Sequence, residues 1–319
     1  MNRLPRVVAV LLLAVPLAVM AQAWPSKQIR IIVPFTAGGF NDTLGRILAQ
    51  DLAKTLGQAV IVENRPGGGS VIGTELAAKS APDGNTLFIA ALPFSVIQSL
   101  YKIPLDVTRD FAPITLAGIS DNMLVANPAF PVSSVQDLIK LAKSKPGSIN
   151  YGSSGAGTSV HLSMELFKTM TGTSMTHIAY KGSAPVVTDL LGGQVDVMFD
   201  NIPNVIQHVK AGRMKALAVS GAKRSFIAPD VPTVAESGVP GYEVSVWFGV
   251  LAPAGTPREI IQRLNAECVR IIGTPEVSER FRNQGVEPRT GTPEQFGDLV
   301  KSEVVRWAKV IKDAGIRAD

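Results

Sequence analysis

The amino-acid sequence predicts an α/β protein of two lobes, each built on a doubly wound, mostly parallel sheet. The first observation is that apolar strand patterns alternate with helical patterns, joined by short glycine or proline turns. The second is that this alternation stops over residues 92–112 and resumes after a long apolar strand at 114–126. The third is composition, because 319 residues that are 46% hydrophobic and 18% charged are enough for two cores.

The first series of elements opens with a strand at 31–33, where three β-branched residues follow one another. Apolar residues from Leu44 to Leu56 then recur at the helical period. A strand at 59–63, a helix at 71–80 and a strand at 86–91 come next. Strands that alternate with helices over short links pair in parallel, so we expect a parallel sheet.

The second series should form the second lobe. Its predicted elements are a helix at 135–143, a strand at 149–152, a helix ending near 170, a strand at 176–180, a helix at 185–191, a strand at 195–199, a helix at 205–210 and a strand at 215–219. A strand at 244–251 and helices at 257–272, 275–284 and 293–313 should return to the first lobe. The predicted domains are 24–123 with 224–319, and 124–223, with a cleft and two crossover strands between them.

Residues 1–23 have the pattern of a cleaved export signal. Arg3 and Arg6 precede an apolar run, and Ala21 and Ala23 are the small residues of a cleavage site. The alternative is a membrane anchor, but the run is shorter than the roughly 20 residues that a spanning helix needs. We therefore expect Trp24 to be the mature N-terminus and the protein to be in a bacterial periplasm.

Charge and cysteine content exclude several classes. The formal charge of +5 falls to +3 once Arg3 and Arg6 are removed, and no basic cluster with interleaved aromatics is present, so we expect no nucleic-acid partner. Cys268 is the only cysteine, so an internal disulfide is excluded. Its place on a predicted helix indicates a buried structural thiol.

Two glycine-bearing turns suggest where a ligand binds. Gly38 and Gly39 follow the first strand, and Asn41 or Asp42 could cap the helix after them. Residues 152–159 repeat the arrangement in the second lobe. Helix starts expose backbone N–H groups that suit an anion. One such turn is also an ordinary strand-to-helix link, but two, one per lobe, favour a cleft that closes over a small carboxylate.

The enzyme motifs that the sequence approaches are incomplete. Gly68 and Gly73 have the spacing of a phosphate-binding loop, but Thr74 occupies the position of the essential lysine. Residues 155–157 begin like a dinucleotide fingerprint, but Val160 replaces its third glycine. Residues 152–156 differ from a nucleophile elbow at the last position. These near-matches favour binding without turnover.

The three histidines, His161, His177 and His208, do not have the spacing of metal ligands. His161 and Glu165 share a helix face, but two groups do not complete a metal site. We expect His161 to be structural or to orient a ligand, and we expect neither a metal nor a cofactor. The remaining enzymatic alternative is an exported α/β enzyme that acts on a small carboxylated or phosphorylated metabolite.

Several motifs carry a family likeness over nearly the whole mature chain. They are VPFTAGGFND at 33–42, ENRPGGG at 63–69, DGNTL at 83–87, YGSSGAGT at 151–158, HL at 161–162, YKG at 180–182, GGQVD at 192–196, PDVPT at 229–233 and APAGTP at 252–257. In these motifs the chain resembles the periplasmic receptors of tripartite tricarboxylate transporters, the Bug-type solute-binding proteins.

The resemblance implies a type II periplasmic binding protein, or Venus flytrap, that delivers a small organic carboxylate to membrane transporter subunits and acts as a monomer. It implies that the ligand lies between the loops at 35–42 and 153–159. The implied ligand-binding residues are Phe35, Thr36, Ala37, Gly38, Gly39, Asn41, Asp42, Ala91, Leu92, Pro93, Ser153, Gly155, Ala156, Gly157, Thr158, Ser159, His161, Tyr180, Lys181, Asp200, Trp247 and Phe248. Thr36 and Asn41 differ from the residues most common in the family, which leaves the solute open.

Several of these residues have two interpretations. Asp42 is either a helix N-cap or an acceptor for an ammonium or N–H group of the ligand, and Asp200 could accept in the same way. If either accepts, amino acids and amides become candidates beside dicarboxylates. Trp247 and Phe248 are either core residues or an aromatic wall that would admit a ring-bearing acid.

Overall fold

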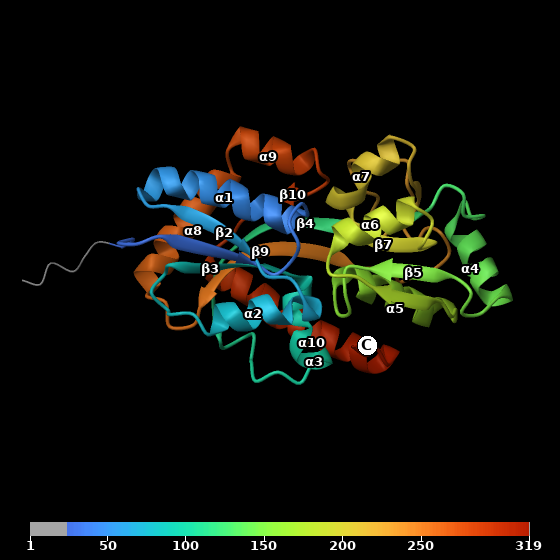
Figure 1. The fold of residues 1–319 in the computed structure, drawn as a ribbon, viewed down its shortest axis with the longest axis horizontal. Coiled ribbons are helices and arrows are strands. Elements are labelled where there is room, and N and C mark those ends of the chain that lie inside the picture. Colours follow the sequence, from blue (N-terminus) through green and yellow to red (C-terminus); the bar gives the residue numbers. More distant parts are fainter. Residues whose placement is uncertain (1–23, 319) are drawn as a thin grey trace, which may run out of the picture.

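The protein has two lobes that lie side by side in the computed structural model, which describes residues 24–318 (Figure 1). The predicted export signal, residues 1–23, lies outside the described residues. Within residues 24–318, no helix is both long enough and apolar enough to cross a membrane.

The elements follow the predicted order, with ends that shift by a few residues. The strands are β1 (Ile29–Val33), β2 (Val60–Asn64), β3 (Thr86–Ala91), β4 (Phe111–Ala126), β5 (Asn150–Ser153), β6 (Thr176–Ala179), β7 (Val197–Asn201), β8 (Lys215–Val219), β9 (Ser245–Pro253) and β10 (Glu287–Pro288). The helices are α1 (Phe40–Leu56), α2 (Val71–Ala78), α3 (Ile97–Leu100), α4 (Val135–Ser144), α5 (Ser159–Thr171), α6 (Ser183–Leu191), α7 (Ile202–Lys210), α8 (Arg258–Ile272), α9 (Pro275–Arg282) and α10 (Pro293–Ala314). The sequence did not predict β10 or α3.

The sheet confirms the two-lobed α/β fold and refines its strand directions. Its order is β2-β1-β3-β9-β4-β7-β5-β6, with β8 and β10 also paired to β4. The three outer strands of each lobe are parallel, as predicted. Strands β9, β8 and β10 pair antiparallel with their neighbours, and so does β4. The centre is antiparallel because β4 leaves the first lobe and β9 returns to it.

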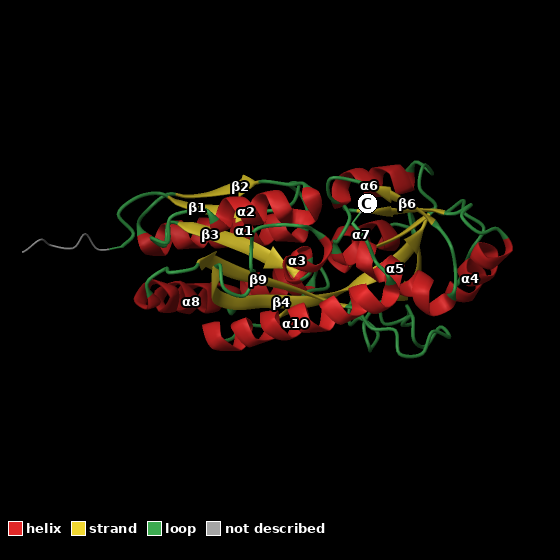
Figure 2. Cartoon of the chain, turned by 90° about the horizontal axis from the view of Figure 1, so that it is seen from below, coloured by secondary structure: helices red, strands yellow, loops and turns green. Residues whose placement is uncertain are grey.

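Strand β4 belongs to both lobes. It pairs with β9 from Phe111 to Asp121 and with β7 from Asn122 to Ala126. Figures 1 and 2 show β4 and β9 running between the lobes, with α10 alongside them. The chain therefore crosses between lobes through β4 and through the segment that leads from β8 into β9.

The buried residues explain why the lobes hold together. One hydrophobic cluster packs α1 and α8 on β1 and β3, and another packs α6 and α7 on β7. A third contains residues of both lobes, such as Trp307 on α10 and Phe199 on β7. Cys268 is fully buried, which confirms the structural thiol, and burial raises its pKa to about 12.

The N-cap of α4 is a serine, whereas that of α1 is a glycine. Ser134 caps α4, because its side chain accepts a hydrogen bond from the Asp137 N–H. The predicted capping of α1 by Asn41 or Asp42 is wrong, because the N-cap is Gly39. The extended backbone of Gly39 places both Asn41 and Asp42 inside the first helical turn, where their side chains serve other purposes.

Candidate functional site

A narrow cavity lies between the lobes, at the ends of the strands that precede four helices. It is lined by Phe35, Thr36, Gly39, Phe40, Asn41, Ala91, Pro93, Ser154, Thr158, Ser159, Ser183, Ala184, Asn201, Asn204 and Val246. Predicted residues in this set are Phe35, Thr36, Gly39, Asn41, Ala91, Pro93, Thr158 and Ser159. The first lobe contributes mainly apolar side chains, and the second contributes mainly hydroxyls and amides.

The four helices that start at this cavity are α1, α5, α6 and α7. Their N-caps are Gly39, Thr158, Gly182 and Asn201. The first-turn N–H groups of a helix have no partner within the helix, and its dipole is positive at this end. None of the described residues that line the cavity carries a charged side chain. The arrangement therefore suits an anion held by main-chain amides.

The starts of α6 and α7 were not identified as part of the site from the sequence. No glycine loop separates β7 from α7, because Asn201 is both the last strand residue and the N-cap. The available signal was Pro203 in the first turn of α7, which is typical of a helix start directly after a strand.

Asp200 lies behind the cavity wall and is fully buried. Its Oδ1 accepts hydrogen bonds from the Ser183 hydroxyl at 2.9 Å, the Asn204 amide at 2.9 Å and the Asn201 N–H at 2.7 Å. Burial raises the pKa of Asp200 to about 6, against the lowering effect of these bonds. Asp200 thus positions three residues that line the cavity, although it does not line the cavity itself.

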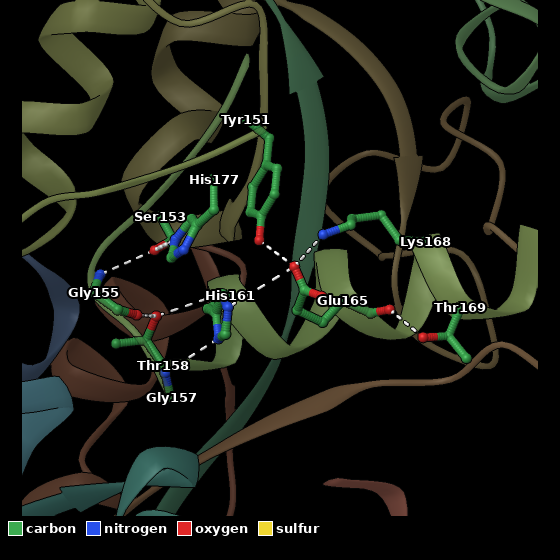
Figure 3. Close-up of polar contacts among 10 residues, drawn as sticks. All are labelled: Tyr151, Ser153, Gly155, Gly157, Thr158, His161, Glu165, Lys168, Thr169 and His177. Carbon is green, nitrogen blue, oxygen red and sulfur yellow. Dashed lines mark hydrogen bonds and ion pairs between the residues drawn. The ribbon is translucent and has the colours of Figure 1, made fainter. Parts of the chain in front are cut away.

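The side chains of Ser153 and His161 accept hydrogen bonds from backbone N–H groups of the loop at 153–159 (Figure 3). The Gly157 N–H donates to His161 Nδ1 at 3.2 Å, and the Gly155 N–H donates to Ser153 Oγ at 3.2 Å. His177 links the two, because its Nε2 lies 2.6 Å from Ser153 Oγ and its ring stacks on His161 with centroids 4.4 Å apart. His161 therefore orients the loop from a buried position.

Glu165 anchors the far side of this network (Figure 3). It accepts hydrogen bonds from the Tyr151 hydroxyl and, at 2.6 Å, from Lys168 Nζ. Burial by itself raises the pKa of Glu165, but the bonds from Lys168 and Tyr151 outweigh it and lower the pKa. Within residues 24–318, no three His, Cys, Asp or Glu side chains are grouped to hold a metal ion.

A second cavity of about 250 Å³ adjoins the first, and both are lined by Phe35 and Ser154. It lies between the glycine turn at 66–70 in the first lobe and the segments at 154–156 and 179–182 in the second. Gly155, Ala156, Tyr180 and Lys181 line this second cavity rather than the first.

The remaining predicted residues line neither cavity. They are Ala37, Gly38, Asp42, Leu92, Ser153, Gly157, His161, Asp200, Trp247 and Phe248. Trp247 packs on Phe296 with ring centroids 5.6 Å apart, and Phe248 packs on Phe40 at 4.6 Å. Trp247 and Phe248 are buried core residues, and the aromatic side chains at the first cavity are instead Phe35 and Phe40.

Asp42 is buried away from the first cavity and bonded by three groups. Its Oδ2 accepts from the Gly38 N–H at 3.1 Å and from Arg46 Nε at 2.9 Å, and its Oδ1 accepts from Asn64 Nδ2 at 3.0 Å. Burial raises the pKa of Asp42, but the bonds from Arg46, Gly38 and Asn64 outweigh it, so the pKa is lowered. The carboxylate fixes the turn before α1.

Comparison with known proteins agrees with this architecture. Residues 44–316 match the model of the tripartite tricarboxylate transporter family receptor. Protein BugT of Bordetella pertussis is 39% identical, and the match covers 99% of each chain. An R. palustris protein solved with adipate is 40% identical with a TM-score of 0.88, covering 92% of this chain and 99% of that one.

MatC from Rhodopseudomonas palustris, solved with bound malate, is 31% identical with a TM-score of 0.86. The match covers 90% of this chain and all of MatC (100%). The matched region includes the strand and helix framework of both lobes, so the chain has the two-lobed type II binding-protein fold. The protein belongs to the tripartite tricarboxylate transporter receptor family.

Proposed function

We propose that this protein is a periplasmic receptor that captures a small organic carboxylate between its lobes and delivers it to a tripartite tricarboxylate-type membrane transporter. The observation that carries the proposal is the meeting of four helix N-termini at one cavity that no charged side chain of the described residues lines. Main-chain N–H groups can hold a carboxylate there without a buried cation. The adipate and malate in the related R. palustris structures support this ligand class.

Capture requires the lobes to separate. The first cavity has a volume of about 30 Å³, which is room for two or three waters at roughly 10–15 Å³ each. A carboxylate must therefore enter an open form and be enclosed as the lobes rotate about the crossover segments. We assign residues 24–123 with 224–319 to one lobe and 124–223 to the other. The change of β4 partner after Asp121 supports this division.

Binding without turnover is part of the proposal. Among the described residues near the loop at 153–159, one serine hydroxyl contacts a histidine ring, as a catalytic nucleophile contacts its base. The distance from Ser153 Oγ to His177 Nε2 is 2.6 Å. Ser153 is fully buried and lines neither cavity, so a substrate could not reach its hydroxyl. We therefore assign this pair a structural role and the protein a transport role, as an exported monomer that begins at Trp24.

A thermal-shift screen of the purified protein tests the proposal. Mono-, di- and hydroxycarboxylates, aromatic acids and amino acids are added at increasing concentration, with inorganic phosphate as a non-carboxylate anion. Because a ligand that binds only the folded state stabilises it, a cognate acid should raise the Tm in a saturable way. If no organic acid raises the Tm at millimolar concentration, the proposed function is wrong.

A further inference from the structure

Asn41 carries a buried hydrogen-bond acceptor that no described residue satisfies. It is the second residue of α1, lines the first cavity and is 8% exposed. Its Oδ1 is buried and accepts no hydrogen bond within residues 24–318. A buried polar atom without a partner costs free energy, so such an atom on a cavity wall indicates a donor on whatever fills the cavity.

Asn204 presents a second acceptor from the opposite lobe. Its Nδ2 donates to Asp200 Oδ1 at 2.9 Å and to Ser183 Oγ at 3.0 Å. These bonds fix the direction of the amide, since a carboxylate oxygen can only accept from it. The Oδ1 is then directed across the cleft, 3.6 Å from the position that a Cβ on Gly39 would occupy.

From these two amides we infer that the solute carries a hydrogen-bond donor, a hydroxyl or a protonated amine, which Asn41 and Asn204 recognise. The main-chain N–H groups at the helix starts bind only acceptors, so they select the carboxylate. The two side-chain carbonyls bind only donors, so they select among carboxylates. This inference rests on the proposed function and narrows it to hydroxy acids or amino acids.

Matched acids test the inference by isothermal titration calorimetry. The three series are succinate, malate and aspartate; glutarate, 2-hydroxyglutarate and glutamate; and adipate, 2-hydroxyadipate and 2-aminoadipate. In the series that binds best, the hydroxy or amino acid should bind about tenfold more tightly than the plain acid, because the plain acid leaves the buried Oδ1 of Asn41 unpaired. Whether the hydroxyl or the amine gives the gain identifies the donor.

Variants connect the preference to Asn41. Asn41→Leu should lower the affinity for the substituted acid more than the affinity for the plain acid. The ratio of these two affinities should therefore approach one. Asn41→Ser is the alternative if the leucine variant does not fold. Asn85→Leu is the control, since Asn85 is also 8% exposed with an unpartnered Oδ1 but lies outside both cavities.

Two results would overturn the inference while leaving the proposed function intact. One is a plain acid that binds as tightly as its substituted partners in the best-bound series. The other is an unchanged ratio in the Asn41 variants. If none of the nine acids binds and no other carboxylate raises the Tm, the proposed function itself fails.

Discussion

The Tyr101 hydroxyl in one lobe donates a 2.9 Å hydrogen bond to the backbone carbonyl of Ala156 in the other. Neither residue lines the first cavity, but both line the second. Gly69 packs against the same pair, because a Cβ at that position would lie 2.1 Å from the Ala156 oxygen. Tyr101, Gly69 and Ala156 therefore form a direct contact between the lobes, which the proposed closure would make and opening would break.

Replacing Tyr101 by Phe should weaken solute binding through faster release. The variant loses one hydrogen bond of about 1 kcal/mol, which is roughly fivefold in affinity, and only in the closed form. Stopped-flow dissociation of a bound acid measures the effect. Thr176→Val is the control, since the Thr176 hydroxyl also donates to a carbonyl, that of Gly147, at 2.8 Å, but this bond lies within the second lobe and away from both cavities. Equal release rates in the two variants would contradict the role of Tyr101.

Replacing Gly69 by Ala should hold the lobes apart. Gly69 has φ +58° and Gly57 has φ +67°, so alanine costs about 1–2 kcal/mol of backbone strain at either position. Only at Gly69 does the added methyl meet the other lobe, since nothing lies within 4 Å of a Cβ at Gly57. Both variants should melt at similarly lowered temperatures, but only Gly69→Ala should lose most of its affinity for an acid by calorimetry. Full affinity in Gly69→Ala would rule out this contact as part of closure.

How far the sequence predicts the site depends on how each helix start is encoded. The starts of α1 and α5 follow loops with paired glycines, Gly38 with Gly39 and Gly155 with Gly157, so the sequence reveals them. The start of α7 has no loop, because β7 runs into it at Asn201. Nothing in a single sequence shows that β9 runs antiparallel to β3, since strand direction depends on the route of the chain between lobes.

The side chains at the cleft were harder to predict than the framework. Trp247 and Phe248 are adjacent on β9 and pack on opposite faces of the sheet, against Phe296 and Phe40. Val246 lines the first cavity instead. Asp200 was identified as a possible ligand contact, but it lies behind the wall, where it accepts a bond from Ser183 on a segment that only the fold brings close. Polar residues at strand ends therefore mark the region of the site but not the contact residues.

The stability of the folded protein should fall as the pH rises through the pKa of Asp200. The pKa of this carboxyl is about 6 in the folded protein and 3.8 in the unfolded reference, because burial disfavours its charged form. The folded state thus holds the proton more tightly. The stabilisation is complete below about pH 4 and is lost as the pH rises through 6, by up to about 3 kcal/mol. Asp121 adds to the same trend, since burial raises its pKa to about 6 as well.

Urea unfolding at several pH values between 4 and 8 measures this slope. Asp200→Asn keeps an acceptor for the three donors and cannot ionise, so its free energy of unfolding should fall less over the same range. Asp298→Asn is the control, because the Asp298 side chain is 78% exposed. A slope unchanged by Asp200→Asn would mean that Asp200 does not titrate in this range.

Replacing Asp42 by Asn should reduce stability and leave solute binding nearly unchanged. All three of its bonds, from Gly38, Arg46 and Asn64, are internal to the first lobe. The donors approach both carboxylate oxygens, and an amide has only one oxygen, so the asparagine side chain cannot accept all three bonds. The loss should be about 1–2 kcal/mol at pH 7 by urea unfolding. Because the pKa of Asp42 is lowered in the folded state, its contribution is present above its unfolded pKa of 3.8 and is lost as the pH falls through the lower folded value. The free energies of unfolding of the wild type and the variant should therefore converge at acid pH.

Asp51→Asn on the same helix is the control. The Asp51 carboxylate pairs with an exposed Lys54, so its replacement should cost less than about 0.5 kcal/mol. The opposite pattern in Asp42→Asn, with intact stability and a tenfold loss of affinity for an amine-bearing acid, would instead place its carboxylate in contact with the solute.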